Sequence, residues 1–323
     1  MRTEVLEVKS AAGKLLCSPV FYPSGKKLLA KGRLLSEEDI RLLDSEGHQS
    51  VAVAVLDEGE VPEEEAAVGI ASQAACGSME IRLAAGGRAN LHATENCCLL
   101  LDEQLLRMVN LSGCLTIATG ENFSYAEAGS RVATVKTAPF AVCRASYEEV
   151  LRNVAEQGPL IQARPMRNPT VGVLYTDPRQ GDRARQLFEG IMRTRLARIG
   201  VSVTYALTAR EDEAAIAKSL EYLLRAKPTV VLVASTTAPA GPEDAVGRGI
   251  SGIGCRLESF LAPVEPGNLL LLAYAGDIPV VAAPGCFRSP RPNVVDLVLP
   301  PLLARYPLSA AEISSLGHGG LLQ

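Results

Sequence analysis

The sequence has few histidines and no cysteine pattern of the kind that builds metal sites or disulfide frameworks. Its three histidines, His48, His92 and His318, lie far apart in the chain. A structural zinc site of the usual cysteine and histidine type is therefore not expected. The eight cysteines include no Cys-x-x-Cys pair and no recurrent spacing, which indicates a reducing compartment and no disulfide framework.

Long hydrophobic runs and an excess of positive charge are also absent. The longest apolar run, Leu269 to Gly276, has eight residues, whereas a membrane-spanning helix needs about 20. The segment Met1 to Glu7 carries acids where a signal peptide requires an apolar core, so we expect a cytoplasmic protein with no membrane partner. Lys and Arg number 32 against 36 Asp and Glu, and this balance of −4 predicts no nucleic-acid partner.

The chain is long and apolar enough to form more than one domain. It has 323 residues, of which 47% are hydrophobic, and a length of roughly 150 residues per domain favours two. Short apolar runs broken by glycine and proline dominate the first half, whereas strand and helix patterns alternate in the second. We therefore expect a β-rich N-terminal region over 1–155, either one domain or two subdomains, a linker over 156–170, an α/β domain over 171–305 and a C-terminal tail over 306–323.

Within the first half, two helices and a sheet are expected. Ser36 has the position of an N-cap, acids follow it, and Gly47 ends the short helix. A second helix is expected to begin near Glu63. Between residues 79 and 142, short apolar stretches separated by glycines predict a small barrel or a sheet of hairpins.

The second half alternates apolar strand patterns with amphipathic helix patterns. Strands are expected over Val171–Tyr175, Val201–Leu207 and Thr229–Ser235, with a helix between each pair. This order predicts an α/β domain with a doubly wound, mostly parallel sheet between two layers of helices. Thr208 and Glu211 have the spacing of a capping box and are expected to begin the second helix.

Prolines and glycines mark the remaining elements of this half. Pro242 is expected at the first position of a helix that carries Asp244 in its first turn. Apolar residues on both sides of Gly276 predict a hairpin, and a last helix is expected over about residues 294–305.

Ligands of open parallel sheets bind beyond the carboxyl ends of the strands. This rule indicates three segments: Thr176–Asp177, Ser235–Asp244 and Pro284–Ser289. The hydroxyls and N–H groups of the second segment, from Ser235, Thr236 and Thr237, lie near a helix start, where anions are favoured. From position alone, the Ser235–Thr237 segment is equally explained as a plain loop. The carboxylate of Asp244 is likewise explained by interaction with the helix dipole, without a ligand.

Two Pro-Gly turns flank the expected hairpin. Pro266-Gly267-Asn268 precedes it and Pro284-Gly285-Cys286 follows it, so both turns can bring backbone close to a ligand. Arg288 and Ser289 then add a cation and a hydroxyl. Taken singly, each turn is equally explained by ordinary turn chemistry.

Together these segments resemble the molybdopterin-binding domain shared by molybdopterin adenylyltransferase and molybdopterin molybdenumtransferase. Gly241, Pro242 and Asp244 match the Gly-Pro-x-Asp-x-Thr sequence that opens a helix in that family, and the two Pro-Gly turns match in order. Val246 stands where the family has threonine. Ala238 and Ala240 replace glycines of a phosphate-binding loop, in which converging N–H groups tolerate no Cβ.

The whole chain is also similar to a group of bacterial proteins labelled molybdopterin-binding, some of them fused to a nucleotidyltransferase. Four short segments carry this second resemblance: Lys31-Gly32 leading into Ser36–Gly47, Gly87–Leu91, Ala133–Lys136 and Gly319–Leu322.

The resemblance implies a molybdopterin-binding protein in molybdenum cofactor biosynthesis or delivery, with a pterin phosphate as ligand or substrate. It implies Asp244 as the catalytic residue of a molybdenumtransferase-like reaction, assisted by Mg²⁺, with no ligands assigned to a resident metal. A homodimer, and a nucleotidyltransferase or molybdoenzyme partner, are further expectations. Two alternatives stay open: a carrier without catalysis, and a nucleotide pyrophosphate hydrolase. The implied cofactor-binding residues are Thr176, Ser235, Thr236, Thr237, Gly241, Pro266, Gly267, Asn268, Pro284, Gly285, Cys286, Arg288 and Ser289.

Overall fold

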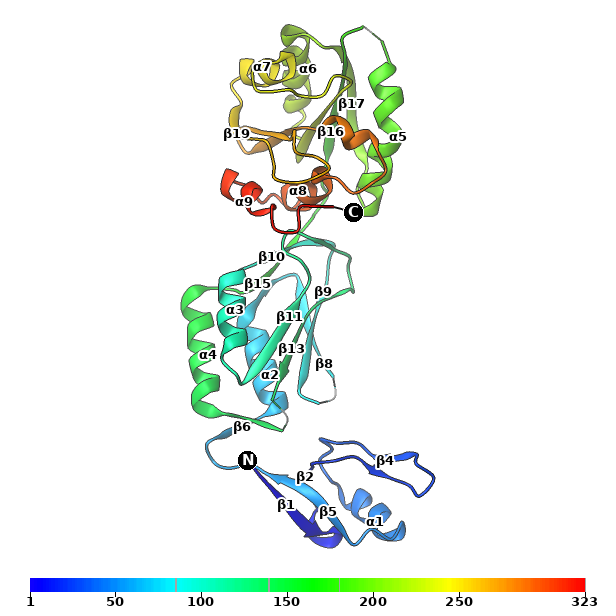
Figure 1. Cartoon of the computed structure of the whole chain (residues 1–323), viewed down its shortest axis with the longest axis vertical. Helices are drawn as coiled ribbons and strands as arrows, with labels where there is room; N and C mark the ends of the chain where they lie inside the picture. The colour runs from blue at the N-terminus through cyan, green and yellow to red at the C-terminus, as the bar shows by residue number, and fades with distance from the viewer. Residues whose placement is uncertain (85, 139, 180, 323) are drawn as a thin grey trace. The chain divides into compact units, whose positions relative to one another are not determined.

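The computed structural model describes residues 1–84, 86–138, 140–179 and 181–322. The chain forms two compact units (Figure 1). Each unit is made of three separate segments of the chain, and because these segments alternate along the sequence, the chain crosses from one unit to the other five times. Unit 1 comprises Met1–Thr94, Leu100–Glu121 and Ala128–Ala163, and unit 2 comprises Glu95–Leu99, Asn122–Glu127 and Arg164–Gln323.

The first part of unit 1 is a small antiparallel sheet with one helix. Its strand order is β1-β5-β2, and β3 and β4 form a separate pair. The Ser36 hydroxyl accepts from the N–H of Asp39, whose carboxylate accepts from the N–H of Ser36, so the predicted cap is confirmed. The bounds are β1 (Arg2–Glu7), η1 (Val8–Ser10), β2 (Leu15–Leu16), β3 (Val20–Phe21), β4 (Lys27–Leu29), α1 (Glu37–Ser45) and β5 (Ser50–Val55).

The rest of unit 1 contains a four-stranded antiparallel sheet in the order β11-β13-β9-β8. Helix α2, which begins at Glu63 as predicted, packs against three of these strands. Elsewhere β14 pairs with β6, and β15 pairs with β7 in parallel. The bounds are β6 (Glu60–Pro62), α2 (Glu63–Ala74), β7 (Ala75–Gly77), β8 (Met79–Ala84), β9 (Arg88–Ala93), α3 (Glu103–Leu111), β11 (Leu115–Thr119), β13 (Arg131–Thr137), β14 (Ala141–Cys143), α4 (Arg144–Gln157) and β15 (Ile161–Pro165).

Between residues 79 and 142 a small barrel or a sheet of hairpins was expected, and the structure has an open antiparallel sheet with β8 and β11 as its ends. Of the described strands of this sheet, only β8 and β9 form a hairpin, because β9 pairs next with β13 and β10 and β12 belong to another sheet. Helices α3 and α4 were not predicted. Each buries only two apolar side chains, Leu105 and Val109 in α3 and Val150 and Val154 in α4. Both pairs have the i, i+4 spacing of one helix face, and Asp102 has the position of an N-cap before α3, so the sequence does carry a helical signal there.

Unit 2 is built on a six-stranded sheet in the order β17-β16-β18-β21-β20-β19. The first four strands are parallel and the last two pairs are antiparallel, which confirms the predicted α/β class and the hairpin. A short pair, β10 with β12, is formed at Cys97–Ala126 and Cys98–Tyr125. The bounds are β10 (Cys97–Leu101), β12 (Tyr125–Ala126), β16 (Val171–Asp177), α5 (Arg183–Arg198), β17 (Val203–Arg210), α6 (Glu213–Arg225), β18 (Val230–Ser235), α7 (Ala245–Gly252), β19 (Arg256–Phe260), β20 (Leu271–Ala275), β21 (Ile278–Ala282), η2 (Gly285–Arg288), α8 (Val294–Leu303) and α9 (Ala310–Ser315).

Helices cover both faces of this sheet (Figure 1). On one face, Leu174 of β16 packs in a core with side chains of α6 and α7. Successive side chains of a strand point to opposite faces, so the neighbouring Tyr175 faces α5. On that side the rings of Phe188 in α5 and Phe287 in η2 stack at 6.4 Å, and Arg195 of α5 pairs with α8.

The sequence misplaced two helix starts in this unit. Strand β17 continues to Arg210, paired with β16, so Thr208 lies in a strand and Asp212 caps α6 by accepting from a backbone N–H. Helix α7 begins at Ala245, with Asp244 as its N-cap. Pro242 lies in the preceding turn, in which the N–H of Asp244 donates to the carbonyl of Gly241 at 3.3 Å.

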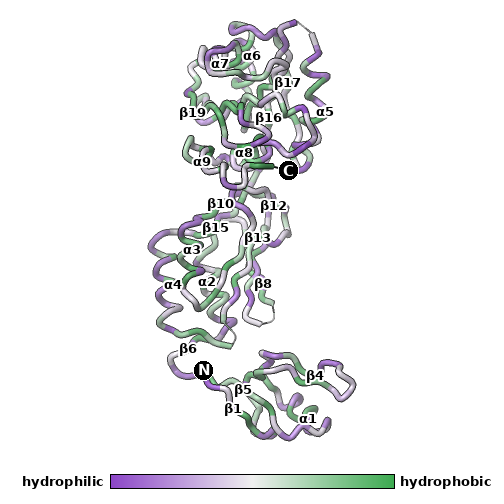
Figure 2. Tube along the Cα trace, in the orientation of Figure 1, coloured by the Kyte–Doolittle hydropathy of each residue, from purple (hydrophilic) through white to green (hydrophobic). Residues whose placement is uncertain are grey.

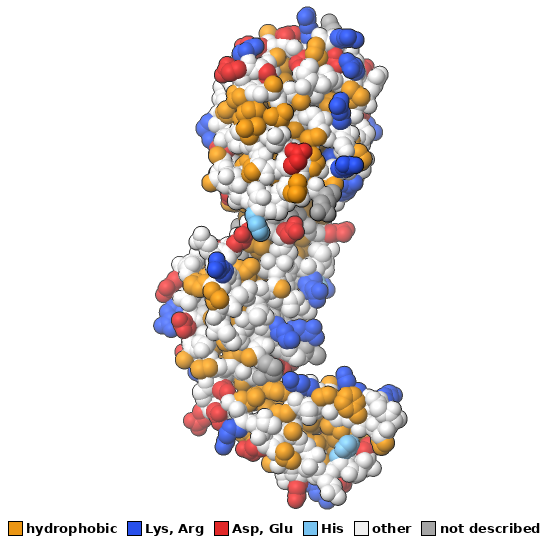
Figure 3. Space-filling model, in the orientation of Figure 1, with side chains coloured by type: hydrophobic (Ala, Val, Ile, Leu, Met, Phe, Trp, Pro, Cys, Tyr) orange, Lys and Arg blue, Asp and Glu red, His pale blue; other side chains and the backbone are white. Residues whose placement is uncertain are grey.

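The distribution of hydrophobic and charged residues agrees with a chain whose positive and negative charges are nearly balanced. In Figure 2 hydrophobic residues are concentrated in the interior of unit 2, around β16, and hydrophilic residues lie along α5. Figure 3 shows charges of both signs dispersed over the visible faces. Throughout the part of the chain that the structure describes, no helix is long and apolar enough to cross a membrane.

Candidate functional site

The sheet of unit 2 changes direction at β16, and this places the predicted loops side by side. The chain leaves β16 for its neighbour on one side, β17, and returns through α6 to β18 on the other side. Thr176 therefore pairs in register with Ser235, and the N–H of Thr236 donates to the carbonyl of Thr176 at 3.1 Å. Crevices at such a switch point are the usual ligand sites of open α/β sheets.

A carboxylate that the sequence did not indicate as a site residue lies at the centre of this edge. Glu211 follows β17, and its Oε2 accepts from the hydroxyls of Thr176 at 3.1 Å and Ser235 at 2.5 Å. The hydroxyl of Thr237 donates to its Oε1. Three of the hydroxyls expected to bind a phosphate are thus held by a negatively charged group.

The loop after β18 satisfies most of its own amides. The N–H of Thr237 donates to the Ser235 hydroxyl at 3.1 Å. The N–H groups of Ala240 and Gly241 donate to Asp244, at 2.6 and 3.4 Å. A ligand at this loop would therefore replace internal hydrogen bonds instead of filling a preformed ring of free donors.

Asp244 uses both carboxylate oxygens for backbone contacts. Its Oδ1 accepts from the N–H of Gly247 at 2.8 Å, and its Oδ2 accepts from Ala240 and Gly241. Such an N-cap ties the loop to the first turn of α7. Both oxygens of Asp244 are therefore occupied by backbone N–H groups, and Asp244 is the N-cap of α7, not a residue of its first turn as predicted.

The loop after β18 and the turn after β21 meet. Ala238 has a positive φ of 63°, and a Cβ built on Gly285 would lie 3.1 Å from the Cβ of Ala238. Pro284, before it, is buried. Two of the segments indicated by the sequence therefore touch at a point that only a small residue at position 285 allows without rearrangement.

The turn before the hairpin joins the same edge through the start of α8. A Cβ on Gly267 would lie 2.9 Å from the N atom of Val294, and this N–H donates to the carbonyl of Pro266 at 3.3 Å. The neighbouring Asn293 donates to the Sγ of Cys286 at 3.0 Å. The two Pro-Gly turns are thus linked by residues at the N-terminus of α8.

Three further predicted residues lie at the rim of this edge. Asn268 and Arg288 are exposed. The third residue, Ser289, is held through its backbone, because its carbonyl accepts a hydrogen bond from the guanidinium of Arg195 at 2.6 Å. Arg195 also donates to the carbonyl of Arg291 at 2.7 Å and pairs with a carboxylate of α8.

Arg195 is a functional support that the sequence reasoning missed. It is 3% exposed, and its guanidinium lies 5.0 Å from the centre of the Phe287 ring. A buried arginine that binds two carbonyls of one loop and a carboxylate of the following helix fixes the loop against that helix. Its position inside the helical stripe of α5, among Leu196 and Met192, gave no signal of this role.

Asp177 faces the other side of the sheet from Glu211. It is 1% exposed; its Oδ1 accepts from the N–H of Arg179 at 2.8 Å, and its Oδ2 has no hydrogen-bond partner of good geometry among the described residues. Burial raises its pKa, but the Arg179 N–H, the Thr236 hydroxyl and the charge of Arg183 outweigh burial, and the pKa lies below its usual range.

The arrangement offers hydroxyl donors and carboxylates, and no metal centre. Among the described residues, no group of three or more His, Cys, Asp or Glu side chains could hold a metal ion. At this edge the carboxylate of Glu211 lies among the hydroxyls of Thr176, Ser235 and Thr237.

The chain is similar to known proteins in its structure and not detectably in its sequence. No family model matches the sequence, and no curated protein matches it. Among solved structures, a molybdenum cofactor biosynthesis protein from Pyrococcus furiosus is similar at 12% sequence identity and a TM-score of 0.25, over 94% of this chain. This chain covers 64% of that protein, which is less than two thirds of its length.

Two other solved structures are similar to the chain. A molybdopterin biosynthesis MoeA protein from Pyrococcus horikoshii has 10% identity and a TM-score of 0.33, covering 97% of this chain and 77% of its own. The molybdopterin biosynthesis enzyme MoaB from Thermus thermophilus has 15% identity and a TM-score of 0.31, covering 48% of this chain and 99% of its own.

Proposed function

We propose that this protein binds molybdopterin at the carboxyl edge of the six-stranded sheet and acts in molybdenum cofactor biosynthesis or delivery. The observation that carries the proposal is the meeting of the segments that share motifs with the molybdopterin-binding family. The loop with Gly241, Pro242 and Asp244 touches the Pro284-Gly285 turn at Ala238. The carboxyl edge beside a switch point of an open α/β sheet is the expected place for such a ligand.

In this proposal the pterin phosphate accepts hydrogen bonds from the hydroxyls of Ser235 and Thr237. Both hydroxyls donate to Glu211 in the ligand-free chain. The phosphate therefore replaces Glu211 as acceptor, and the charge of Glu211 opposes it. The start of α7 contributes the positive end of a helix dipole on the same side.

A second candidate is a cofactor carrier that holds molybdopterin without turning it over. The hydrogen bonds of Asp244 favour it, because both oxygens accept from backbone N–H groups of Ala240, Gly241 and Gly247. A catalytic carboxylate needs an oxygen free to contact the reacting group. A carrier would pass the cofactor to a nucleotidyltransferase or a molybdoenzyme, either as a monomer or as a homodimer.

Pterin occupancy tests the proposal. The protein is purified from a host that makes molybdenum cofactor, then denatured and oxidised, and fluorescent pterin is quantified per chain. Gly285→Val pushes on Ala238, whose Cβ is 3.1 Å from the new Cβ, and is expected to lower occupancy. Gly190→Val is the matched control, because nothing lies within 4 Å of a Cβ at that position.

Asp244→Asn separates the two candidates. Asparagine is as good an N-cap as aspartate, so α7 is retained. Bound pterin with no turnover of adenylylated molybdopterin in either form supports the carrier, whereas turnover that Asp244→Asn abolishes supports a transferase. Failure of the wild-type protein to bind added molybdopterin would reject both, and cleavage of pyrophosphate-linked nucleotides would then favour a hydrolase.

A further inference from the structure

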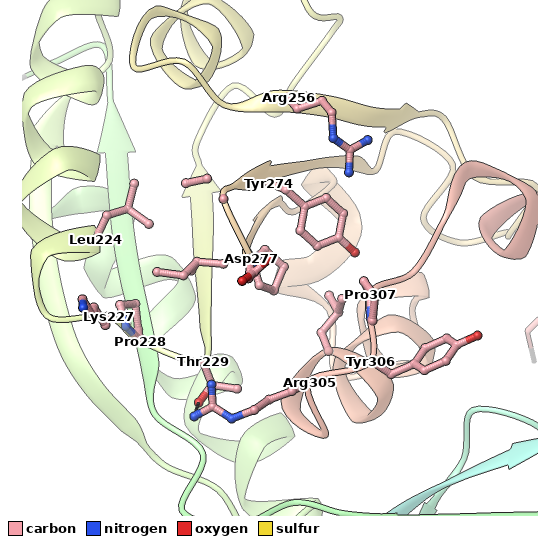
Figure 4. A pocket seen from close by; sticks show the side chains of 15 residues that line it. Leu224, Lys227, Pro228, Thr229, Arg256, Tyr274, Asp277, Arg305, Tyr306 and Pro307 are labelled. Carbon is pink, nitrogen blue, oxygen red and sulfur yellow. Dashed lines mark hydrogen bonds between the residues drawn. The ribbon is translucent and has the colours of Figure 1, made fainter.

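A cavity lies at the amino edge of the same sheet, at the end opposite the proposed molybdopterin site (Figure 4). It lies within unit 2 and has a volume of about 770 Å³. Its walls come from the connection before β18, the β20–β21 turn and the segment after α8. Small-molecule sites occupy roughly 300–1,000 Å³, so the cavity has the size of a ligand site.

The cavity carries an excess of positive charge. Its cations are Lys227, Arg256 and Arg305, and Asp277 is the one carboxylate among its described lining residues. Arg256 is neutralised by an ion pair with Glu258. In the described part of the chain, neither Lys227 nor Arg305 has a carboxylate within 4.0 Å, so these two cations have no ion-pair partner. Together with Asp277 they give the lining a net positive charge.

Stabilisation of helix ends does not account for these two cations. The carbonyls of Ala304 and Arg305, at the end of α8, accept from the guanidinium of Arg164 at 2.9 and 2.8 Å. Helix α6 has Arg225 in its last turn. Each helix therefore already has a cation at its negative end, and the side chains of Lys227 and Arg305 are left for another role.

The backbone at both cations is in a conformation that favours glycine. Lys227 has a φ of 49° and Arg305 a φ of 57°. Each follows the C-cap of a helix, Ala226 of α6 and Ala304 of α8, at the position where glycine is the common residue. The chain thus keeps a cation at two strained positions of one cavity, and strained residues cluster at ligand sites.

The remaining walls are apolar and rigid. Leu224 and Ile278 line the cavity beside the ring of Tyr274. The Tyr274 hydroxyl donates to a backbone carbonyl at 2.9 Å, which fixes the ring. Figure 4 shows Arg305 extending toward Thr229, whose hydroxyl lies 3.5 Å from the guanidinium. A polar end and a flat apolar body are the complementary features of a ligand.

We propose that this cavity binds a phosphate monoester with a flat, largely apolar body, with the phosphate held by Lys227 and Arg305. A phosphate monoester carries a charge of about −1.5 to −2 near pH 7, and Lys227 and Arg305 are lining cations that have no ion-pair partner among the described residues. The planar fork of Arg305 suits two phosphate oxygens at once. The apolar side chains of Leu224 and Ile278 then contact the body of the ligand. The site is separate from the proposed molybdopterin site and does not depend on it.

Calorimetric titration of the full chain tests this site. The probes are adenosine monophosphate, adenosine and inorganic phosphate. The variants are Lys227→Gly and Arg305→Gly, which keep the fold because glycine suits a positive φ. Lys218→Ala, at an exposed position of α6, is the matched loss of a positive charge outside the cavity. Gly285→Val reports any binding at the opposite edge.

Binding of adenosine monophosphate that is stronger than binding of inorganic phosphate, with adenosine much weaker, is the expected result. Lys227→Gly and Arg305→Gly should each lower the affinity about tenfold or more, as the loss of one charge-assisted hydrogen bond does. Lys218→Ala and Gly285→Val should leave it unchanged. Three results would overturn the proposal: no binding of adenosine monophosphate, equal binding of adenosine, or full affinity in both glycine variants.

Discussion

The charge of Glu211 should limit the affinity of the carboxyl edge for an anion. Glu211→Gln keeps the shape and one acceptor oxygen, for the hydroxyls of Thr176 and Ser235, and it removes the negative charge. Its NH2 group replaces the oxygen that accepts from Thr237, whose hydroxyl then accepts a hydrogen bond from the amide. If the pterin phosphate accepts from the same hydroxyls, the variant should bind molybdopterin more tightly than the wild-type protein.

The size of this effect follows from the hydrogen-bond geometry. A phosphate oxygen that shares the Ser235 hydroxyl with Glu211 would lie about 5 Å from the carboxylate, the span of two hydrogen bonds. Repulsion between unit charges at that distance is about 0.8 kcal/mol in water and about 3 kcal/mol at an effective dielectric constant of 20. Because Thr237 is exposed, water screens the charges in part, and a gain of roughly tenfold in affinity is expected.

Equilibrium dialysis against molybdopterin under anaerobic conditions, followed by pterin fluorescence, measures the affinity. Glu221→Gln on α6 is the control for loss of a remote charge. The gain in Glu211→Gln should shrink as salt is added, because screening weakens the repulsion. Weaker binding by Glu211→Gln would refute the reasoning, because the carboxylate would then be a ligand of the bound group and the phosphate would lie elsewhere.

Three other predictions concern stability and reactivity. Gly247→Ala should lower the free energy of unfolding by about 1–3 kcal/mol, because its Cβ would lie 2.2 Å from the carbonyl oxygen of Pro242. Gly252→Ala, in open space on the same helix, should be neutral or stabilising. Equal urea midpoints for the two variants would contradict the predicted clash. The pKa of Asp177 is lowered in the folded state, so its stabilisation is present above about pH 4 and is lost as the pH falls through the folded pKa; Asp177→Asn should therefore be less stable at neutral pH, and the difference should vanish in acid. Backbone N–H groups at the start of α4 lower the pKa of the exposed Cys143 thiol. Iodoacetamide should therefore alkylate Cys143 before the buried cysteines at neutral pH, which mass spectrometry would detect. Alkylation of a buried cysteine before Cys143 would contradict the assignment.

The class of unit 2 and the adjacency of the loops at the proposed site were predictable from the sequence. Alternation of strands and helices fixes a parallel sheet, and a parallel sheet fixes which strand ends face a ligand. Thr176 and Ser235 are adjacent for this reason alone. The contact of Ala238 with Gly285 was not predictable, because it joins two loops that only the finished sheet brings together.

Glu211 was missed because local and tertiary interpretations of one pattern compete. Thr208 and Glu211 have the spacing of a capping box, and this local pattern predicts that both residues belong to the start of a helix. Pairing of β17 with β16 extends the strand to Arg210 and moves the cap to Asp212. The carboxylate three residues after a threonine was then free to accept the hydroxyls of the neighbouring strands. The same rule that selected Thr176 would have found it, since Glu211 directly follows a strand.

The repeated crossing of the chain between its two units has a consequence for dissecting the protein. A truncated chain that begins at Arg164 would lack Glu95–Leu99 and Asn122–Glu127, which belong to unit 2. Such a fragment loses the hydrogen bond from the Met166 N–H to the Asn96 carbonyl, at 2.8 Å, and the partner of Arg167. Deleting either half of the gene product should therefore yield an incomplete unit 2. Binding by either unit is therefore best measured on the full chain, with substitutions confined to that unit.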